Sequence, residues 1–285
     1  MTKKSTSKKS ISSFKIEFIE ESDNRITVLL RNVPVTIANS IRRAIISHVP
    51  TLAIERVFIF RNDSLMNDDM LAHRLGLIPL TTPLGKYALP EEASGEEGSK
   101  PEYAELTLTI EAKDKPITVL SGDIKSKDPD VKPVSDDIEI VRLAPGQGIE
   151  AEMWAYMGRG KDHAKWSPVS VSVVRGLPVI KIKKTDCKKK CKKCVEACPK
   201  GVLAVKKGQL VVEDLYKCTT CGLCMEACPD IIKVSIDESS SILYLESIGQ
   251  LRPIEIISLA FDEVIKKLDD FYSSLNEVSL ENVEA

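Results

Sequence analysis

Hydrophobic and polar residues alternate along much of the chain, and this pattern predicts a sheet-rich protein. Residues 14–19 and 25–30 alternate on either side of a polar turn and predict a hairpin. The same alternation recurs further along in short runs separated by turn residues, which predicts a mostly antiparallel sheet region. These runs are residues 52–60, 105–110, 117–120, 138–143, 149–157, 169–174 and 179–182, with one more strand predicted at 241–247.

Apolar residues at helical spacing predict one helix near the start of the chain and a longer one at its end. The first begins at Pro34, where the fixed backbone angle of proline favours a helix start, and it ends at Pro50. Its predicted apolar face consists of Ile37, Ile41, Ala44, Ile45 and His48.

The second helix begins near Pro253 and keeps its helical period for about 22 residues, a rod of roughly 33 Å at ~1.5 Å per residue. An apolar stripe of this length must be buried. Packing on its own domain accounts for part of it, and its length also favours a partner helix. The stripe consists of Ile257, Phe261, Val264, Ile265, Leu268, Phe271, Tyr272 and Leu275.

Composition places the chain among ordinary globular proteins. It has 285 residues, 43% of them hydrophobic and 29% charged, with a net charge of -2 that steers it toward no polyanion. No apolar run approaches the ~18–20 residues of a membrane span, and the basic start of the chain is no secretory signal. We therefore expect a cytoplasmic protein with no membrane association, a disordered tail over residues 1–12 and an exposed loop over residues 83–103.

All eight cysteines lie between Cys187 and Cys228, a clustering that indicates a metal site rather than a disulfide framework. Cys218-x2-Cys221-x2-Cys224-x3-Cys228, followed by proline, matches the bacterial ferredoxin pattern. Three thiolates spaced in this way can wrap a loop around one cubane, and the fourth reaches a second cluster. A structural zinc site is the alternative.

The first half of the cysteine segment repeats the second half thirty residues earlier, with one departure. Three residues, not two, separate Cys187 from Cys191. Ligand exchange would give one cluster on Cys198, Cys218, Cys221 and Cys224, and a second one on Cys187, Cys191, Cys194 and Cys228. If the second of these sites is empty, Cys198 and Cys228 are ligands or a disulfide pair, and the alternative is a three-iron cluster on Cys218, Cys221 and Cys224. The prediction is at least one 4Fe-4S or 3Fe-4S cluster and at most two.

Eight lysines between Lys181 and Lys193 are interpreted as a solvated rim that offsets the charge of the thiolate clusters. Contact with nucleic acid is the alternative, but no aromatic residues are interleaved for base stacking. No second cofactor motif and no catalytic arrangement is visible: Gly146-Gln-Gly148 lacks the third glycine of a dinucleotide-binding loop. We predict no catalytic residues in this chain.

Three further segments carry a resemblance to a known family. Residues 39–55, including Arg42 and Arg43, and residues 71–80, including His73, resemble two motifs of the RNA polymerase α-like subunits. Residues 158–168 resemble a loop shared by the archaeal and eukaryotic members. A ferredoxin-like insert is typical of the archaeal D subunits, and this resemblance covers nearly the whole chain except the tail.

The resemblance implies an α+β fold with three parts. A discontinuous α-like dimerization domain takes residues 13–50 and 240–285, a sheet-rich insert domain takes residues 51–182, and a small ferredoxin-like 4Fe-4S domain takes residues 183–232.

The resemblance also implies a non-catalytic assembly subunit of DNA-directed RNA polymerase, which takes part in nucleotidyl transfer only within the complex. Its implied partners are the smaller α-like subunit L (Rpo11), the subunits N (Rpo10) and P (Rpo12) and the large catalytic subunits, with any DNA contact indirect. The iron–sulfur module would be mainly structural, with a redox-regulatory role as a lesser alternative. The rival interpretations are a ferredoxin-like electron-transfer protein and an oxidoreductase subunit. Candidate interface residues are Asn39, Ile41, Arg42, Arg43, Phe261, Val264, Ile265, Leu268 and Phe271.

Overall fold

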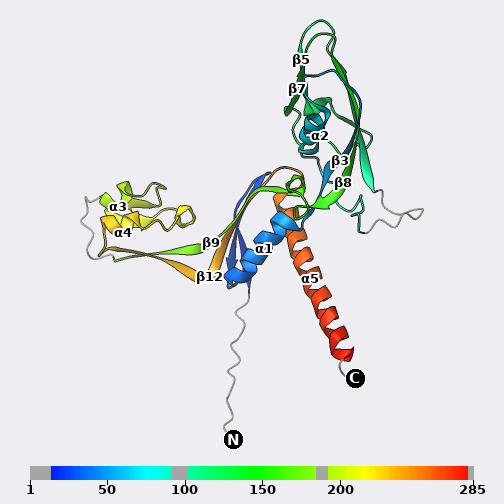
Figure 1. Ribbon diagram of the computed structural model, residues 1–285. Helices are drawn as coiled ribbons and strands as arrows, with labels where there is room; N and C mark the ends of the chain where they lie inside the picture. Colours follow the sequence, from blue (N-terminus) through cyan, green and yellow to red (C-terminus); the bar gives the residue numbers. More distant parts are fainter. Residues whose placement is uncertain (1–13, 92–101, 184–191, 282–285) are drawn as a thin grey trace. The chain divides into compact units, whose positions relative to one another are not determined.

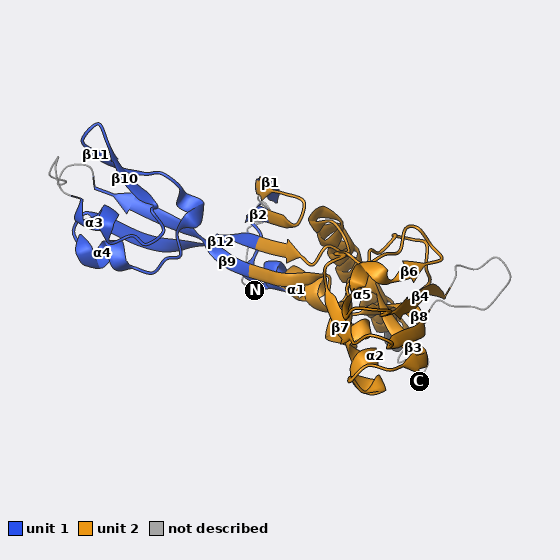
Figure 2. Ribbon diagram, turned by 90° about the horizontal axis from the view of Figure 1, so that it is seen from above, with its two compact units in different colours: residues 1–19, 27–39, 174–243 blue, residues 20–26, 40–173, 244–285 orange. Residues whose placement is uncertain are grey.

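The computed structural model describes residues 14–91, 102–183 and 192–281 (Figure 1), so the predicted tail over residues 1–12 lies outside the described residues. The chain divides into two compact units (Figure 2). Unit 1 comprises residues 1–19, 27–39 and 174–243. Unit 2 comprises residues 20–26, 40–173 and 244–285.

Unit 2 contains an antiparallel sheet in the order β3-β8-β4-β6. Its strands are β3 (Pro50–Asn62), β8 (Gly148–Arg159), β4 (Tyr103–Glu111) and β6 (Lys125–Ser126). A second, two-stranded sheet joins β5 (Ile117–Leu120) to β7 (Glu139–Leu143). Side chains along β4 alternate between buried and less buried positions, as the sequence alternation predicts for a sheet with one face on the core.

The main core of unit 2 lies between these sheets and the helix α2 (Asp68–Gly76). No helix is predicted here from the sequence, and only two of its nine residues, Leu71 and Leu75, are buried. Asp68 and Asp69 in the first turn favour the helix, since they lie near the positive end of its dipole. The fully buried core residues of unit 2 include Leu52, Ile54, Leu80, Leu106, Leu108, Ile140 and Leu143.

Of the segment predicted as an exposed loop, residues 83–103, the structure describes residues 83–91, 102 and 103, and these are not all exposed. Tyr87, Ala88 and Leu89 are buried, which corrects the prediction for these residues. The tyrosine hydroxyl donates a hydrogen bond of 2.6 Å to the carboxylate of Asp128. These apolar side chains therefore attach residues 87–89 to the core.

Unit 1 carries parts of a four-stranded sheet in the order β1-β2-β12-β9. The strands are β1 (Lys15–Glu21), β2 (Arg25–Arg31), β12 (Ile232–Ser247) and β9 (Val169–Ile182). The strands predicted at 169–174 and 179–182 are one continuous strand, although Gly176 and Pro178 lie between them. Proline is tolerated here because β9 is the edge strand of the sheet.

The cysteine-rich part of unit 1 consists of short elements. These are α3 (Lys193–Glu196), β10 (Leu203–Lys206), β11 (Gln209–Val212), a 3₁₀ turn at Leu215–Lys217 and α4 (Leu223–Ala227). The two strands form a hairpin whose turn residues Lys207 and Gly208 both have positive φ, at 51° and 76°. That geometry matches the right-handed twist of the paired strands.

Two longer helices complete the chain, α1 (Val35–Ser47) and α5 (Pro253–Glu281). Of the predicted apolar face of α1, Ile41, Ala44 and Ile45 are buried, whereas Ile37 is exposed. Helix α5 has 29 residues and is longer than predicted. Its beginning is buried within unit 2, and its second half extends away from the other elements of that unit (Figure 1).

Candidate metal centre and interface residues

The second cysteine motif lies on a tightly curled loop that leads into α4. The Sγ atom of Cys218 accepts a hydrogen bond of 3.5 Å from the backbone N–H of Thr220. Thr220 and Gly222 both adopt the left-handed conformation, with φ of 55° and 84°. Two left-handed residues turn the backbone sharply, so the loop curves back between Cys218 and Cys224.

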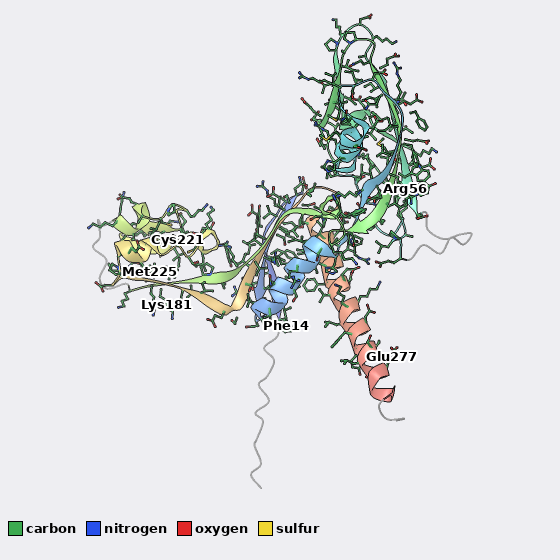
Figure 3. The ribbon with its side chains drawn as sticks, viewed as in Figure 1. Phe14, Arg56, Lys181, Cys221, Met225 and Glu277 are labelled. Atoms are coloured by element: carbon green, nitrogen blue, oxygen red, sulfur yellow. The ribbon has the colours of Figure 1, made fainter. Side chains whose placement is uncertain are left out.

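Four cysteines line one small cavity in this module: Cys198, Cys218, Cys221 and Cys224. They are the same four that ligand exchange assigns to one cluster. Cys198 follows α3 and its Sγ accepts a 3.4 Å hydrogen bond from the N–H of Val202. Figure 3 shows Cys221 at this module, and its side chain is exposed, whereas that of Cys224 is buried. The rest of the cavity wall is mainly apolar and includes Ile180, Val202, Leu203 and Val234.

Burial raises the pKa of the Cys224 thiol above its ordinary value, and the neighbouring Cys198, Cys218 and Cys221 raise it further. Desolvation and like charges both disfavour the thiolate. A bound cation removes both penalties, because thiolates are the form that ligates metal. The site therefore has the donor chemistry of a metal centre that releases protons when it is loaded.

The second predicted ligand set is only partly described. Cys187 and Cys191 lie outside the described residues. Cys194 and Cys228 are buried in an apolar cluster that also contains Leu203, Leu210 and Ile232. The six described cysteines form no disulfide with one another.

The donor set fits an iron–sulfur cluster. Within the described ranges, no three His, Cys, Asp or Glu side chains form a group that could hold a single metal ion. A cubane instead takes one thiolate at each of its irons, so its ligands surround a cavity. Four thiols around a mainly apolar cavity, with backbone N–H groups directed at Cys198 and Cys218, provide that arrangement.

An arginine that sequence reasoning missed supports the cysteine loop. Arg175 of β9 donates from Nη1 to the carbonyl oxygen of Cys218 at 2.6 Å, and from Nη2 to that of Tyr216. Its acceptors are backbone oxygens more than 40 residues away along the chain, at separations of 43 and 41. No local sequence motif marks such a contact.

The predicted interface residues of α1 differ in their exposure. Ile41 is buried within the chain, Arg42 is half-buried, and Asn39 and Arg43 are exposed. Ile41 therefore packs in this chain's own interior. Sequence reasoning alone does not separate these positions, because all four belong to one motif.

The predicted interface residues of α5 become more exposed along the helix. Phe261 and Val264 are half-buried. Ile265, Leu268 and Phe271 are exposed by 54%, 61% and 62%, respectively, and Tyr272 by 67%. The second half of the stripe is therefore uncovered in the isolated chain.

The loop motif at residues 158–168 is held by close packing in unit 2. A Cβ atom at Gly158 would lie 2.4 Å from the Trp166 ring, and one at Gly160 would lie 2.1 Å from the carbonyl oxygen of Ile46. Arg159 between them is buried and pairs with Glu91 at 2.9 Å and with Glu263 of α5 at 3.6 Å. A larger residue at either glycine would clash with these neighbours, and the arginine connects this strand end to α5.

The second motif of the resemblance lies on α2. Arg74 donates a hydrogen bond of 2.8 Å from Nη2 to the carbonyl oxygen of Glu139, and Gly76 lies close to the backbone of Ile54. His73 lines a surface cavity together with residues of the third motif, Lys165 and Trp166 among them. Two motifs that are far apart in the sequence therefore converge on one surface.

None of the helices in the described parts of the chain combines the length and hydrophobicity that a membrane span requires.

Comparison with known families identifies the class of protein. A model of the RNA polymerase Rpb3/RpoA insert domain matches residues 57–179, and a model of a 4Fe-4S dicluster domain matches residues 179–229. The chain thus combines an α-like polymerase subunit with an iron–sulfur domain. This confirms the α+β class and the predicted iron–sulfur module.

Full-length relatives specify the family. The DNA-directed RNA polymerase subunit Rpo3 of Aeropyrum pernix is 37% identical over 276 residues, which covers 93% of this chain and 96% of the relative. The Rpo3 subunits of Methanosphaera stadtmanae and Pyrococcus furiosus are 38% and 32% identical, and the alignments cover 92% and 93% of this chain and 98% of each relative. The chain belongs to the Rpo3 family of DNA-directed RNA polymerase subunits, as the sequence motifs predict.

Proposed function

We propose that this chain is a non-catalytic assembly subunit of DNA-directed RNA polymerase that pairs through α5 with the smaller α-like subunit L (Rpo11). The observation that carries the proposal is the exposed apolar stripe of Ile265, Leu268 and Phe271. These residues lie on the second half of α5, which extends away from the other elements of unit 2. Exposed apolar patches on stable proteins mark interaction sites. Burial of each large side chain contributes about 1.5–3 kcal/mol.

The pair, joined by the subunits N (Rpo10) and P (Rpo12), would nucleate assembly of the large catalytic subunits. The relatives' shared description as polymerase subunits supports this role. Nucleotidyl transfer would then belong to the complete complex, with the active-site magnesium on the large subunits. The proposed site of action is the cytoplasm, and any contact of this chain with DNA would be indirect.

In this proposal the discontinuous dimerization domain comprises residues 13–50 and 240–285. The insert domain comprises residues 51–182, and the ferredoxin-like domain comprises residues 183–232. Support for the insert and ferredoxin-like domains comes from the two domain models, which match residues 57–179 and 179–229.

The iron–sulfur centre in this proposal is held by Cys198, Cys218, Cys221 and Cys224. Support comes from the single cavity that these four side chains line. A second cluster would take Cys187, Cys191, Cys194 and Cys228. When bound, a cluster supplies thiolate–iron bonds that tie distant chain segments together, which makes its main role structural.

Purification of the tagged chain from its native cells tests the proposed function. We expect the smaller α-like subunit and the large polymerase subunits to co-purify in defined stoichiometry, as measured by mass spectrometry. Co-purification with a flavoprotein or a dehydrogenase, without polymerase subunits, would instead support the electron-transfer interpretation and overturn the proposal.

Metal analysis of anaerobically prepared protein tests the proposed centre. We expect iron together with inorganic sulfide: about four of each per chain for one cubane, about eight of each for two, and about three irons to four sulfides for a three-iron cluster. Zinc in place of iron, with no inorganic sulfide, would show that the cysteines form a structural zinc site.

A further inference from the structure

Several backbone groups of the loop that carries Cys218 have hydrogen-bond partners. The N–H of Cys218 donates to the carbonyl oxygen of Leu215 at 3.1 Å, and its own carbonyl oxygen accepts from Arg175 at 2.6 Å. Two residues earlier, the N–H of Tyr216 donates to the carboxylate of Asp214 at 3.0 Å. The position of the Cys218 side chain is therefore set by the backbone around it.

The conformation of this loop needs such support. Thr220, two residues after Cys218, has φ of 55°, in a region that β-branched side chains rarely adopt. A strained residue of this kind persists only where the surrounding structure holds it. The support on the N-terminal side of the loop comes from Arg175, which contacts the carbonyl oxygens of both Tyr216 and Cys218.

We propose that Arg175 is a positioning residue for the iron–sulfur centre, an inference that rests on the proposed ligands Cys198, Cys218, Cys221 and Cys224. Its guanidinium bridges two carbonyl oxygens and holds Cys218 in the geometry of the cluster before the cluster binds. A planar group with a fixed fork of donors can make both contacts, whereas the single ammonium of lysine is a point donor.

The positive charge of Arg175 also favours binding of the cluster. A cluster ligated by four thiolates is anionic, and a guanidinium group is a cation. The guanidinium is half-buried beside the loop, where screening by solvent is weaker than at an exposed lysine. Lys217, adjacent to Cys218, is exposed and pairs only with Asp214 among the ion pairs of the described chain. It carries the same charge without the carbonyl contacts and is the matched control.

The test compares full-length chains, co-purified anaerobically with their polymerase partners, in the variants Arg175→Gln, Arg175→Lys and Lys217→Gln. Release of iron to a chelator is followed over time, and the electron paramagnetic resonance spectrum of the reduced cluster is recorded. We expect Arg175→Gln to accelerate iron release by about tenfold or more, a typical effect of losing an outer-shell contact, and to alter the spectrum. Arg175→Lys should also release iron faster than the wild type, and Lys217→Gln should match the wild type.

Three results would overturn the proposal: wild-type release and spectrum in Arg175→Gln, wild-type release in Arg175→Lys, or an equal effect of Lys217→Gln. The milder Arg175→Lys variant keeps the test available if Arg175→Gln yields no folded chain.

The variant Cys218→Ser tests the proposed ligands separately from the role of Arg175. Normal iron content in Cys218→Ser refutes the ligand assignment, whereas depleted iron there beside a normal Arg175→Gln refutes only the role of Arg175.

Discussion

Leu268→Asp is expected to abolish pairing of this chain with the smaller α-like subunit. Leu268 is 61% exposed in the chain alone and lies on the same face of α5 as Ile265 and Phe271. Its burial in an interface contributes about 1.5–3 kcal/mol, and an unpaired carboxylate buried in its place adds a desolvation penalty. Since each 1.4 kcal/mol is about a tenfold change in affinity, we expect at least a hundredfold weaker binding in a titration of the partner subunit.

Ser273→Asp is the matched control on the same helix. Ser273 is exposed and lies five residues further on, away from the apolar stripe. The substitution Ser273→Asp introduces the same charge into a helix interior as Leu268→Asp does, and the intrinsic helix propensity of aspartate is similar at the two positions. Full-affinity pairing by Leu268→Asp would refute the proposed interface. Equal loss in both variants would attribute the effect to damage of the helix.

Local pattern predicted most of the secondary structure because strands and helices bury one face. The predicted strand at residues 117–120 coincides with β5, and the hairpin near the N-terminus matches β1 and β2. The predictions were wrong where tertiary position decides. The proline of β9 is compatible with a strand only because that strand lies at a sheet edge, which the local sequence does not reveal.

Helix α2 and the buried residues Tyr87, Ala88 and Leu89 were missed for a related reason. Helix α2 buries only Leu71 and Leu75, and the other buried residues are three in a row, so neither segment has a helical or strand period that predicts its burial. The core that receives these side chains comes from strands distant in the sequence. Their burial is therefore a property of the assembled fold.

The candidate site, too, was only partly predictable from the local sequence. Regular spacing predicts the cysteines as ligands, because three thiolates of one loop must reach one cluster. The position of Cys198 beside Cys218, Cys221 and Cys224 depends on how the two halves of the module pack. The contacts of Arg175 depend on β9 lying next to the cysteine loop, and backbone carbonyl acceptors leave no trace in a sequence.

Replacement of both Cys218 and Cys224 by serine is expected to unfold the cysteine-rich module and to reduce the yield of assembled polymerase. The buried core of the module is small: Cys194, Leu203, Leu210, Cys224, Cys228 and Ile232. A unit of about 50 residues rarely folds on such a core without metal or disulfides. In small metal-dependent domains, the metal contributes on the order of 10 kcal/mol to folding.

Three measurements check this expectation: iron per chain, resistance of the module to proteolysis, and the amount of complete polymerase that co-purifies with the chain. Glu226→Gln is the matched control, because Glu226 is exposed on α4, does not line the cysteine cavity and is no predicted ligand. We expect the control to match the wild type in all three. If the double variant keeps a protease-resistant module and normal assembly while losing only a redox signal, the structural role is wrong. Electron transfer then becomes the better interpretation, because thiolate–iron bonds would not be holding the module together.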